Sequence, residues 1–408
     1  MLIVQKFGGT SVGSIERIRH VAQLMIDTQR RGHQVVGVVS AMSGETNRLV
    51  DLATQINPQP WSKEYDMLLA SGEQVSVALV TLAINSLGGK ARGLLAHQLG
   101  ILTDSVYSKA RIQGINTDAL RREISQGVIP VVAGFQGVDV ENNITTLGRG
   151  GSDTSAVAIA AALGADDCEI YTDVDGVYST DPRLCSKARK LKTITYDEMM
   201  ELAGLGAKVL QIRSVELAAK YKVSLHVRSS FDLIEGTRVV AEGPKMEQVV
   251  VSGIAADLND AILTVSNLSD QPGLAYEIFS PLAQSTVVVD VIVQARAANA
   301  EEGLSLSFTV PKTDLPKAKE ILEEKFRSRF PRMQIQSETN AAKVSIVGAG
   351  MRHHPGVAAK MFGVLAAAGI NIKLISTSEI KVTVLVDASK AQEAVQRLHE
   401  AFELDKSQ

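Results

Sequence analysis

The first residues able to do chemistry stand near the N-terminus, in the stretch VQKFGGTSVGS at residues 4–14. Lys6 ends a short apolar strand and is followed by the glycines Gly8 and Gly9. Glycines let backbone N–H groups turn toward an anion, the helix that follows adds its positive end, and Lys6 adds a full charge. The order of lysine and glycines differs from both the GxxxxGK[ST] and the GxGxxG loops. The stretch indicates either an anion site of another kind or a glycine turn with a purely geometric role.

The most informative stretch is TLGRGGSDTSAVAIAAALGAD, at residues 146–166. Arg149 offers a planar fork that matches a carboxylate, and the amides from Gly150 to Ser152 open an alanine-rich helix at its positive end. We expect an anion to bind here. Asp153, in the first turn of that helix, either stabilises the helix dipole or holds phosphate-binding lysines in place.

A third group, ASGEQVS at residues 70–76, interrupts an apolar helical run with Gly72 and Glu73. A glycine costs a helix up to about 1 kcal/mol, so we expect a packing or functional reason for Gly72. Glu73 stands among apolar neighbours, where a carboxylate must be paired, and a substrate ammonium group is one possible partner. The alternative is a glutamate on the solvent side of the helix.

Two further loops follow predicted strands, where ligands collect in open α/β sheets. The loop SAMSGETNRL at residues 40–49 is rich in hydroxyl groups, and an ordinary turn is its other interpretation. The loop YTDVDGVYSTDPR at residues 171–183 carries three aspartates, which suggest magnesium. A calcium loop that began at Asp173 would need a carboxylate at its twelfth position, where Leu184 stands, so we discount calcium.

The same loop contains groups suited to a nucleotide. Tyr178 and Arg183 fit a purine and a phosphate, and Lys208, in GLGAKVL at residues 204–210, gives a second cation for the phosphates. Direct metal ligands cannot be assigned from the sequence.

Composition limits the class of protein. A chain of 408 residues is longer than one ordinary domain with a single hydrophobic core, so we expect two or three domains. A net charge of −3 gives no general attraction to nucleic acid or to anionic membranes. With no signal-peptide pattern and no long uninterrupted apolar run, we expect a cytoplasmic protein. Cys168 and Cys185 lack metal-ligand spacing and are expected to be reduced.

Strand and helix patterns alternate over residues 1 to about 230. The expected elements are strands at 2–4, 34–40, 128–138, 168–173 and 223–228 and helices at 15–25, 63–87 and 153–163, with Ser14 as the first N-cap. This order predicts an α/β domain with a mostly parallel sheet covered by helices on both faces.

The C-terminal third contains a repeat. An offset of 83 residues places Pro272 and Gly273 on Pro355 and Gly356. After a loop that is shorter in the second copy, the strand at 304–310 matches that at 380–386 at an offset of 76. Each copy reads strand, helix, strand, strand, helix in about 70 residues. We expect the paired copies to bury their strands against each other and to bind a ligand at their seam, unless they serve only dimerisation.

The segments KFGGTSVG, SAMSGETNRL, SGEQVS, LGRGGSDTSA, YTDVDGVYSTDPR and GAKVL, in this order, resemble the aspartate kinases of the amino-acid kinase family. The paired C-terminal copies resemble ACT regulatory domains. The resemblance implies a three-layer αβα kinase domain at 1–245 and βαββα ACT-like units at 246–330 and 331–408, whose strands could be exchanged between the units. No dehydrogenase domain follows Gln408, so a monofunctional enzyme is expected.

The resemblance also implies the reaction. ATP, with Mg²⁺, would phosphorylate the side-chain carboxylate of L-aspartate to 4-phospho-L-aspartate, the entry to lysine, threonine, methionine and diaminopimelate synthesis. The attacking carboxylate is already ionised, so no general base is required, and catalysis rests on positioning and charge neutralisation.

The residues implied by the resemblance fall into four groups. The catalytic residues are Lys6, Asp153 and Lys208. The nucleotide-binding residues are Lys6, Phe7, Gly8, Gly9, Ser40, Thr172, Asp173, Tyr178, Arg183, Lys208 and Val209. The substrate-binding residues are Thr46, Glu73, which pairs with the ammonium group, Arg149, which binds the α-carboxylate, Gly150, Gly151 and Ser152. The effector-binding residues are Asp270, Gly273, Leu274, Ala275, Asp290, Gln294, Asn371, Ile372, Ser378 and Glu379.

Regulation is the part that the resemblance leaves most open. The stretch SDQPGLA with Asp290 and Gln294 resembles a threonine-type effector site, and NIKLISTSE at 371–379 resembles the part associated with lysine. The second copy reads RHHPGVA and lacks the acidic residue before Pro-Gly, so lysine, threonine or both remain open as inhibitors. We expect a homo-oligomer joined through the ACT units. Met246 could start a separate regulatory subunit, although an ordinary linker methionine is the other interpretation.

Three alternatives were weighed. Kinases that act on glutamate, acetylglutamate, carbamate or UMP are close relatives, but Glu73 and Arg149 offer both partners of a free amino acid. A catalytically silent amino-acid sensor on the same fold would not need Lys6, Asp153 and Lys208. A nicotinamide oxidoreductase would need GxGxxG after the first strand, which is absent.

Overall fold

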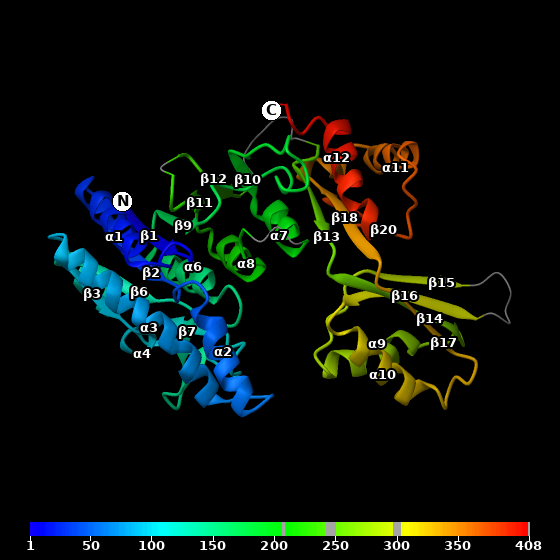
Figure 1. Ribbon diagram of the computed structural model, residues 1–408, viewed down its shortest axis with the longest axis horizontal. Coiled ribbons are helices and arrows are strands. Elements are labelled where there is room, and N and C mark those ends of the chain that lie inside the picture. The colour runs from blue at the N-terminus through cyan, green and yellow to red at the C-terminus, as the bar shows by residue number, and fades with distance from the viewer. Residues whose placement is uncertain (206–208, 233, 242–249, 297–302, 407–408) are drawn as a thin grey trace. The chain divides into compact units, whose positions relative to one another are not determined.

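The computed structural model describes residues 1–205, 209–232, 234–241, 250–296 and 303–406 (Figure 1). The described residues divide into two compact units. Residues 1–177, 190–204 and 209–241 make up the N-terminal unit. Residues 178–189, residue 205 and the described residues from 250 onward make up the C-terminal unit.

A large sheet forms the centre of the N-terminal unit. Its strands are β1 (Leu2–Phe7), β2 (Gln34–Val39), β3 (Ala91–Leu94), β6 (Ile129–Ala133), β9 (Asp167–Thr172), β10 (Thr193–Thr195), β11 (Leu225–Ser229) and β12 (Thr237–Val240). Among the described residues the strand order is β10-β12-β11-β9-β1-β2-β6-β3, and every neighbouring pair is parallel except β11 with β12. The carboxyl ends of β1, β2, β6 and β9 therefore share one edge of the sheet.

Helices cover both faces of this sheet, as the sequence predicts. They are α1 (Ile15–Arg30), α2 (Glu45–Ile56), α3 (Lys63–Ser86), α4 (Ala96–Leu99), α5 (Asp118–Ser125), α6 (Gly151–Leu163), α7 (Tyr196–Gly204) and α8 (Ile212–Tyr221). The face with Phe7 packs on α1 and α3. Lys6, the neighbour of Phe7, points to the opposite face, where α6 lies. The Ser14 hydroxyl caps α1 by accepting from the N–H of Arg17.

The N-terminal unit also contains a smaller sheet, whose strands β7 (Gln136–Val138) and β8 (Ile144–Thr146) lie between β6 and α6 in the chain. Its other strands are β4 (Ile101–Thr103) and β5 (Ile112–Ile115), and the order is β5-β4-β7-β8 among the described residues. The sequence predicts one strand over 128–138, but the chain turns between β6 and β7, where Phe135 has φ of 69°. The predicted last strand, β11, is likewise followed by β12, which pairs antiparallel with it, so that Thr237 lies opposite Val227.

Helix α3 is continuous through Gly72 and Glu73, as the predicted helix over 63–87 requires. A Cβ atom at Gly72 would lie 2.9 Å from the Cβ of Ala41, so the glycine lets α3 approach the loop that follows β2. By length and composition α3 could cross a membrane, but half of its most apolar window is buried inside the protein. It is a core helix of the N-terminal unit.

The C-terminal unit contains the predicted repeat. The first copy consists of β14 (Asp260–Leu268), α9 (Leu274–Gln284), β15 (Ile292–Arg296), β16 (Leu304–Pro311) and α10 (Leu315–Phe326). The second consists of β18 (Ala341–Val347), α11 (Val357–Ala367), β19 (Leu374–Thr377), β20 (Lys381–Asp387) and α12 (Ala391–Ala401), with short 3₁₀ turns η1 (Ala349–His353) and η2 (Ala388–Lys390). Both copies thus have the predicted order.

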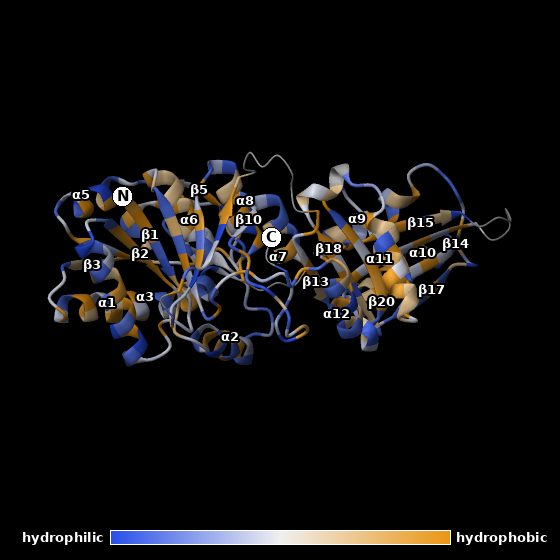
Figure 2. Cartoon of the chain, turned by 90° about the horizontal axis from the view of Figure 1, so that it is seen from above, coloured by the Kyte–Doolittle hydropathy of each residue, from blue (hydrophilic) through white to orange (hydrophobic). Residues whose placement is uncertain are grey.

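The two copies exchange strands. Strand β13 (Gly253–Asp257), which precedes the first copy, pairs with β18 of the second, and β17 (Gln334–Glu338), which precedes the second copy, pairs with β14 of the first. Among the described residues the sheets read β15-β16-β14-β17 and β13-β18-β20-β19. Figure 2 shows hydrophobic residues concentrated on strands such as β1, β2 and β20 and hydrophilic residues on α12.

One segment belongs to a different unit from its sequence neighbours. Residues 178–189 leave the N-terminal unit after Val177 and pack in the C-terminal unit, and the chain returns at Lys190. Cys185 is buried in the core of the second copy, and the Ser179 hydroxyl lies 2.9 Å from Nε2 of the buried His399 on α12. We call residues 178–189 the strap.

Candidate active site

Lys6 and Asp153 form the centre of the candidate site. Lys6, near the end of β1, places its Nζ 2.6 Å from Oδ1 of Asp153 in the first turn of α6. Both side chains are about nine-tenths buried. The pair brings the predicted lysine to the positive end of α6, and the aspartate holds that lysine in place. The second predicted cation, Lys208, lies outside the described residues.

The glycine turn after β1 lies against the loop after β2. The N–H of Ser43 donates to the carbonyl of Gly9 at 3.1 Å, and a Cβ atom at Gly9 would lie 2.8 Å from the Ala41 carbonyl oxygen. A Cβ atom at Gly8 would lie 3.5 Å from Nζ of Lys6. Gly9 is therefore required by the close approach of the Ala41 carbonyl, whereas a Cβ atom at Gly8 would make only ordinary contacts, and the Gly8 backbone stands beside the charge of Lys6.

Glu73 faces the same loop from α3. Its Oε1 accepts a hydrogen bond from the N–H of Ala41 at 2.9 Å, while its Oε2 has no hydrogen-bond partner among the described residues. The side chain is only 3% exposed, and burial raises the pKa of Glu73 to about 7. A buried carboxylate oxygen without a partner is costly, so this oxygen is suited to a cationic ligand group.

Arg149 lies in the turn between β8 and α6. Gly150 caps α6 in the left-handed conformation, with φ of 69°, and so the first turn of the helix has no side-chain cap. The Arg149 side chain is exposed and pairs with no carboxylate among the described residues. Gly151, Ser152 and Asp153 follow in the first turn of α6, which leaves an exposed guanidinium next to the positive end of a helix.

The remaining predicted residues of the N-terminal unit also stand at this edge. Thr172 ends β9, and its hydroxyl donates to the carboxylate of the exposed Asp173 at 3.1 Å. Ser40 follows β2, Thr46 lies in the first turn of α2, and Val209 is half-buried. The ring of Phe7 is completely buried and stacked on Tyr171, so only its backbone can face a ligand.

Two predicted nucleotide residues, Tyr178 and Arg183, belong to the strap and hence to the C-terminal unit. Arg183 is exposed and makes a close ion pair with Asp181, at 2.6 Å. Their contact with a nucleotide stays a prediction.

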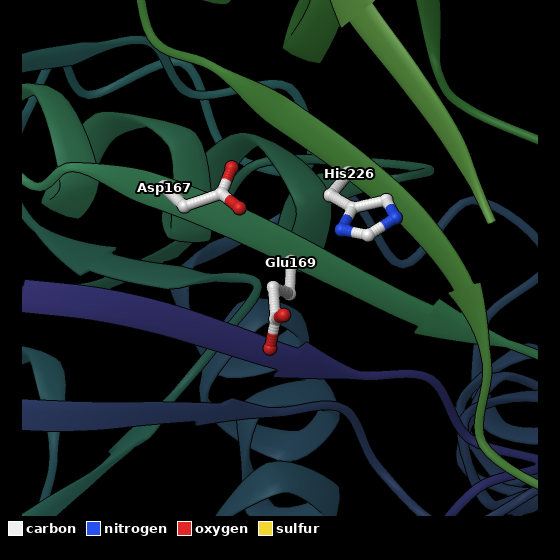
Figure 3. A group of neighbouring side chains, drawn as sticks. All are labelled: Asp167, Glu169 and His226. Carbon is white, nitrogen blue, oxygen red and sulfur yellow. The ribbon is translucent and has the colours of Figure 1, made fainter. Parts of the chain in front are cut away.

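A buried cluster on the large sheet could be mistaken for a metal centre. Asp167 and Glu169 on β9 and His226 on β11 lie close together (Figure 3). Arg228 already pairs with Glu169 at 2.8 Å and Arg238 with Asp167 at 3.1 Å. Burial and these arginines lower the pKa of His226 to about 4. Each carboxylate is already neutralised by an arginine, and Asp167 is the first residue of β9, at the opposite edge of the sheet from the Lys6 site. We therefore infer that the cluster stabilises the sheet.

The predicted effector residues are spread over both copies of the C-terminal unit, and the structure brings Asp290 of the first copy to Lys343 of the second. Strands β15 and β19 lie next to each other, and Val293 and Leu374 pack on one small buried cluster between the sheets. Asp290 pairs with the buried Lys343 at 2.6 Å, and Lys343 also contacts Asp260. Asp270 pairs with Arg296. The other predicted effector residues are Gly273 at the start of α9, the buried Leu274, the half-buried Ile372, and the exposed Ala275, Gln294, Asn371, Ser378 and Glu379.

Sequence reasoning missed two residues that hold the Arg149 turn. Asp66 on α3 and Arg213 on α8 bind backbone groups on either side of this turn. Asp66 could have been noticed, because it is a charged residue two helical turns before Glu73 in the same apolar run. Arg213 carries no comparable signal.

Comparison with known proteins gives a consistent answer over the whole chain. Residues 1–229 match the amino acid kinase family, and residues 344–402 match an ACT domain. An aspartate kinase from Pseudomonas putida is 51% identical over 405 residues, which are 99% of this chain and 98% of that protein.

Solved structures agree. The crystal structure of E. coli aspartokinase III in complex with aspartate and ADP superposes with a TM-score of 0.81 at 25% identity and covers 98% of this chain and 99% of that one. The same E. coli enzyme in complex with lysine and aspartate gives a TM-score of 0.77 at 26% identity, with coverage of 98% and 99%.

Proposed function

The chain belongs to the amino acid kinase family as an aspartate kinase with C-terminal ACT domains, and from this premise we propose how its residues carry out and regulate the reaction. The γ-phosphoryl group of ATP passes to the side-chain carboxylate of L-aspartate and gives 4-phospho-L-aspartate. The observation that supports the assignment of the substrate most strongly is the buried Oε2 of Glu73, which has no hydrogen-bond partner in the described part of the chain.

On the phosphate side, Lys6 neutralises the charge on the transferring group. Asp153 keeps the ammonium group of Lys6 in position through the 2.6 Å ion pair, and the backbone of Gly8 and Gly9 approaches the phosphates. Lys208 is expected to add a second cation. Phosphoryl transfer requires little covalent chemistry from the protein, so positioned charge is its main contribution.

On the substrate side, Glu73 binds the ammonium group of aspartate and Arg149 binds its α-carboxylate. The two side chains bind opposite charges of the amino acid. Glu73 offers a buried carboxylate oxygen that has no partner among the described residues, and Arg149 offers an exposed guanidinium group. With both ends of the amino acid held, its side-chain carboxylate is directed at the γ-phosphorus, and Thr46 helps to seat it.

Magnesium fits this site as a partner of the phosphates. It would neutralise charge on the β- and γ-oxygens. Asp153 and Asp175 are already paired with Lys6 and Lys190, at 2.6 and 3.2 Å. Asp173, in the same loop as Asp175, is exposed and makes no ion pair among the described residues, so we expect it to reach an ion that the phosphates hold.

Lysine, threonine or both are proposed to inhibit the enzyme by binding at the seam between the C-terminal sheets. The strap supports a physical route for this inhibition. It continues the chain directly from the predicted nucleotide loop at 172–177, yet Ser179 and Cys185 are anchored in the core of the C-terminal unit. A change at the seam can therefore pull on the end of the nucleotide loop through the backbone.

The test is ADP formation with ATP, magnesium and L-aspartate, repeated with L-glutamate and then with lysine, threonine or both. We expect turnover with aspartate and not with glutamate, and inhibition by at least one end product. Equal turnover with glutamate would remove the proposed roles of Glu73 and Arg149. Turnover without inhibition would remove the effector proposal and leave the reaction intact.

Two further proposals concern assembly. We expect the enzyme to be a homo-oligomer joined through its ACT units. Met246 lies outside the described residues, and its use as an internal start stays a prediction that mass spectrometry of the native protein checks. Absence of a C-terminal species of roughly 160 residues would contradict it.

A further inference from the structure

The turn that carries Arg149 is fixed by a charged side chain that the proposed mechanism does not use. Asp66, on α3, is completely buried and accepts hydrogen bonds from the N–H groups of Thr146 at 2.6 Å and of Ser108 at 2.9 Å. The hydroxyl of Ser108 donates a third bond to the same carboxylate at 3.1 Å. One carboxylate thus holds the end of β8 together with the segment 108–110 beside it.

A second charged side chain holds the same two segments from the other side. Arg213, on α8, donates to the carbonyl oxygens of Leu147 at 2.9 Å and of Ala110 at 2.8 Å. The N–H of Ala110 also donates to the carbonyl of Thr146 at 2.9 Å. Asp66 therefore binds the N–H groups, and Arg213 the carbonyl groups, of one pair of backbone segments.

The residues around Arg149 have little room to shift. A Cβ atom at Gly148 would lie 2.9 Å from the carbonyl oxygen of Ser108, and one at Gly150 would overlap the side chain of Gln211. Ser108 itself has φ of 68°, a left-handed conformation that a non-glycine residue adopts only when its surroundings enforce it. The Arg149 turn is therefore packed between residues 108–110 on one side and residues 211–213 on the other.

Helix α3 links this turn to the other proposed substrate contact. Asp66 and Glu73 are seven residues apart, which is close to two turns, so they lie on nearly the same side of one helix. Glu73 is proposed to bind the ammonium group directly, and Asp66 fixes the segment that leads to Arg149. A single rigid element therefore sets the separation between the two groups that hold the amino acid.

Asp66 and Arg213 bind backbone groups and not other charged side chains of the described residues. Among the described residues, no salt bridge involves Asp66 or Arg213. Burial raises the pKa of Asp66, although the bonds from Ser108 and Thr146 act in the opposite direction. Burying a charge to hold backbone groups is costly compared with apolar packing, and such cost is common where position matters for function.

We propose that Asp66 and Arg213 are positioning residues for the substrate, which set where Arg149 stands relative to Glu73 and so determine the affinity for aspartate. The proposal rests on the proposed role of Arg149 in binding the α-carboxylate of aspartate.

The test begins with Asp66→Asn, which keeps the shape of the side chain but removes its charge. A neutral amide oxygen then replaces Oδ2, which accepts from both backbone N–H groups, and an N–H₂ group that can only donate replaces Oδ1 beside the Ser108 hydroxyl. We expect KM for L-aspartate to rise by about tenfold to about a hundredfold, and KM for ATP to change by less than about twofold. The matched control is Asp139→Asn. Asp139 is also a buried carboxylate that accepts from backbone N–H groups, of Glu141 and Asn143, but at the far end of the β7–β8 hairpin. This control should lose stability without a change in KM for aspartate.

A double-mutant cycle shows whether Asp66 acts through Arg149. In an Arg149→Ala background, Asp66→Asn should add little further loss, because the group that it positions is gone. If the two losses simply multiply, or if KM for aspartate and KM for ATP rise together, Asp66 has only a structural role and the proposal is overturned. If Arg149→Ala alone leaves KM for aspartate unchanged, the proposed role of Arg149 has failed instead.

Arg213 provides an independent variant should Asp66→Asn not fold. Arg213→Met should raise KM for aspartate in the same range, and Arg213→Lys, which can reach one of the two carbonyl groups, should recover part of the affinity. Equal KM values for Arg213→Met and the wild type would overturn the proposal.

Discussion

The residues proposed to bind substrates and those proposed to bind effectors differ in how they are held before any ligand arrives. In the N-terminal unit, Lys6, Asp153 and Glu73 are buried and fixed by named partners. In the C-terminal unit, Asp270 and Gln294 are exposed, and the ion-pair partner of Asp270 is an exposed arginine. The proposed catalytic residues are preorganised for charge, whereas exposed effector residues such as Asp270 and Gln294 can be rearranged by a ligand at little cost.

This difference explains how regulation can coexist with catalysis. A buried ion pair resists small displacements because breaking it leaves an uncompensated charge. The exposed pair of Asp270 and Arg296 lacks that resistance, and in the proposed route the strap carries movements of the C-terminal unit to the nucleotide loop. The contrast predicts that variants of the cleft act on turnover and that variants of the strap act on inhibition.

The largest effect is expected from Lys6→Met. Loss of the cation beside the transferring phosphoryl group should lower kcat by about a hundredfold to a thousandfold. The control is Arg92→Met, which breaks an ion pair with Glu123 of the same 2.6 Å length at a distance from the carboxyl edge. Steady-state kinetics of the two variants decide the matter, and similar losses of kcat in both would contradict the proposed role of Lys6.

Glu73→Gln should mainly raise KM for aspartate, by about tenfold to about a hundredfold, because the amide cannot balance the ammonium charge. The raised pKa of Glu73, about 7, adds a pH signature. Aspartate needs the ionised carboxylate, so KM of the wild type should rise as pH falls below about 7, and this dependence should be absent in the variant. Parallel pH profiles for the two proteins would refute the assignment.

The same variant should be more stable than the wild type without ligand. Because folding raises the pKa of Glu73 above its ordinary 4.5, the carboxyl stabilises the fold fully below pH 4.5 and loses that contribution as pH rises through about 7. At pH 8 the neutral glutamine should gain up to about 3 kcal/mol in the free energy of unfolding. Urea unfolding at pH 8 and pH 5 measures this, and an equal difference at both pH values would show that ionisation is not its cause.

The smallest effect on turnover is expected from Ser179→Ala, in the strap. It removes the contact with His399 and the bond accepted from the N–H of Arg189 at 2.9 Å. The effector concentration for half-inhibition should rise about fivefold, with kcat within about twofold of the wild type. Ser345→Ala, which removes another buried hydroxyl pair of the C-terminal unit, is the control. Matching inhibition curves for both variants would separate the strap from regulation.

Several features of this protein follow from the sequence because they depend on local spacing. A lysine at the end of a strand and an aspartate at the start of a glycine-led helix meet at the carboxyl edge of any parallel sheet, which is why Lys6 and Asp153 could be predicted as partners. Glu73 could be predicted as buried because its neighbours along α3 are apolar. The repeat of the C-terminal third is visible as an internal offset, and its strand and helix order is correct.

Other features depend on contacts between segments far apart in the chain. The need for a glycine at position 72 is decided by the close approach of Ala41, and the break between β6 and β7 by the pairing of β7 with β8. The hold of Asp66 and Arg213 on the Arg149 turn joins residues up to 103 positions apart. The strap is the clearest case, since its sequence continues the nucleotide loop but its side chains pack with α12. Local patterns determine which groups are available for chemistry, and only tertiary packing decides what holds them, because burial and backbone partners are properties of the folded chain.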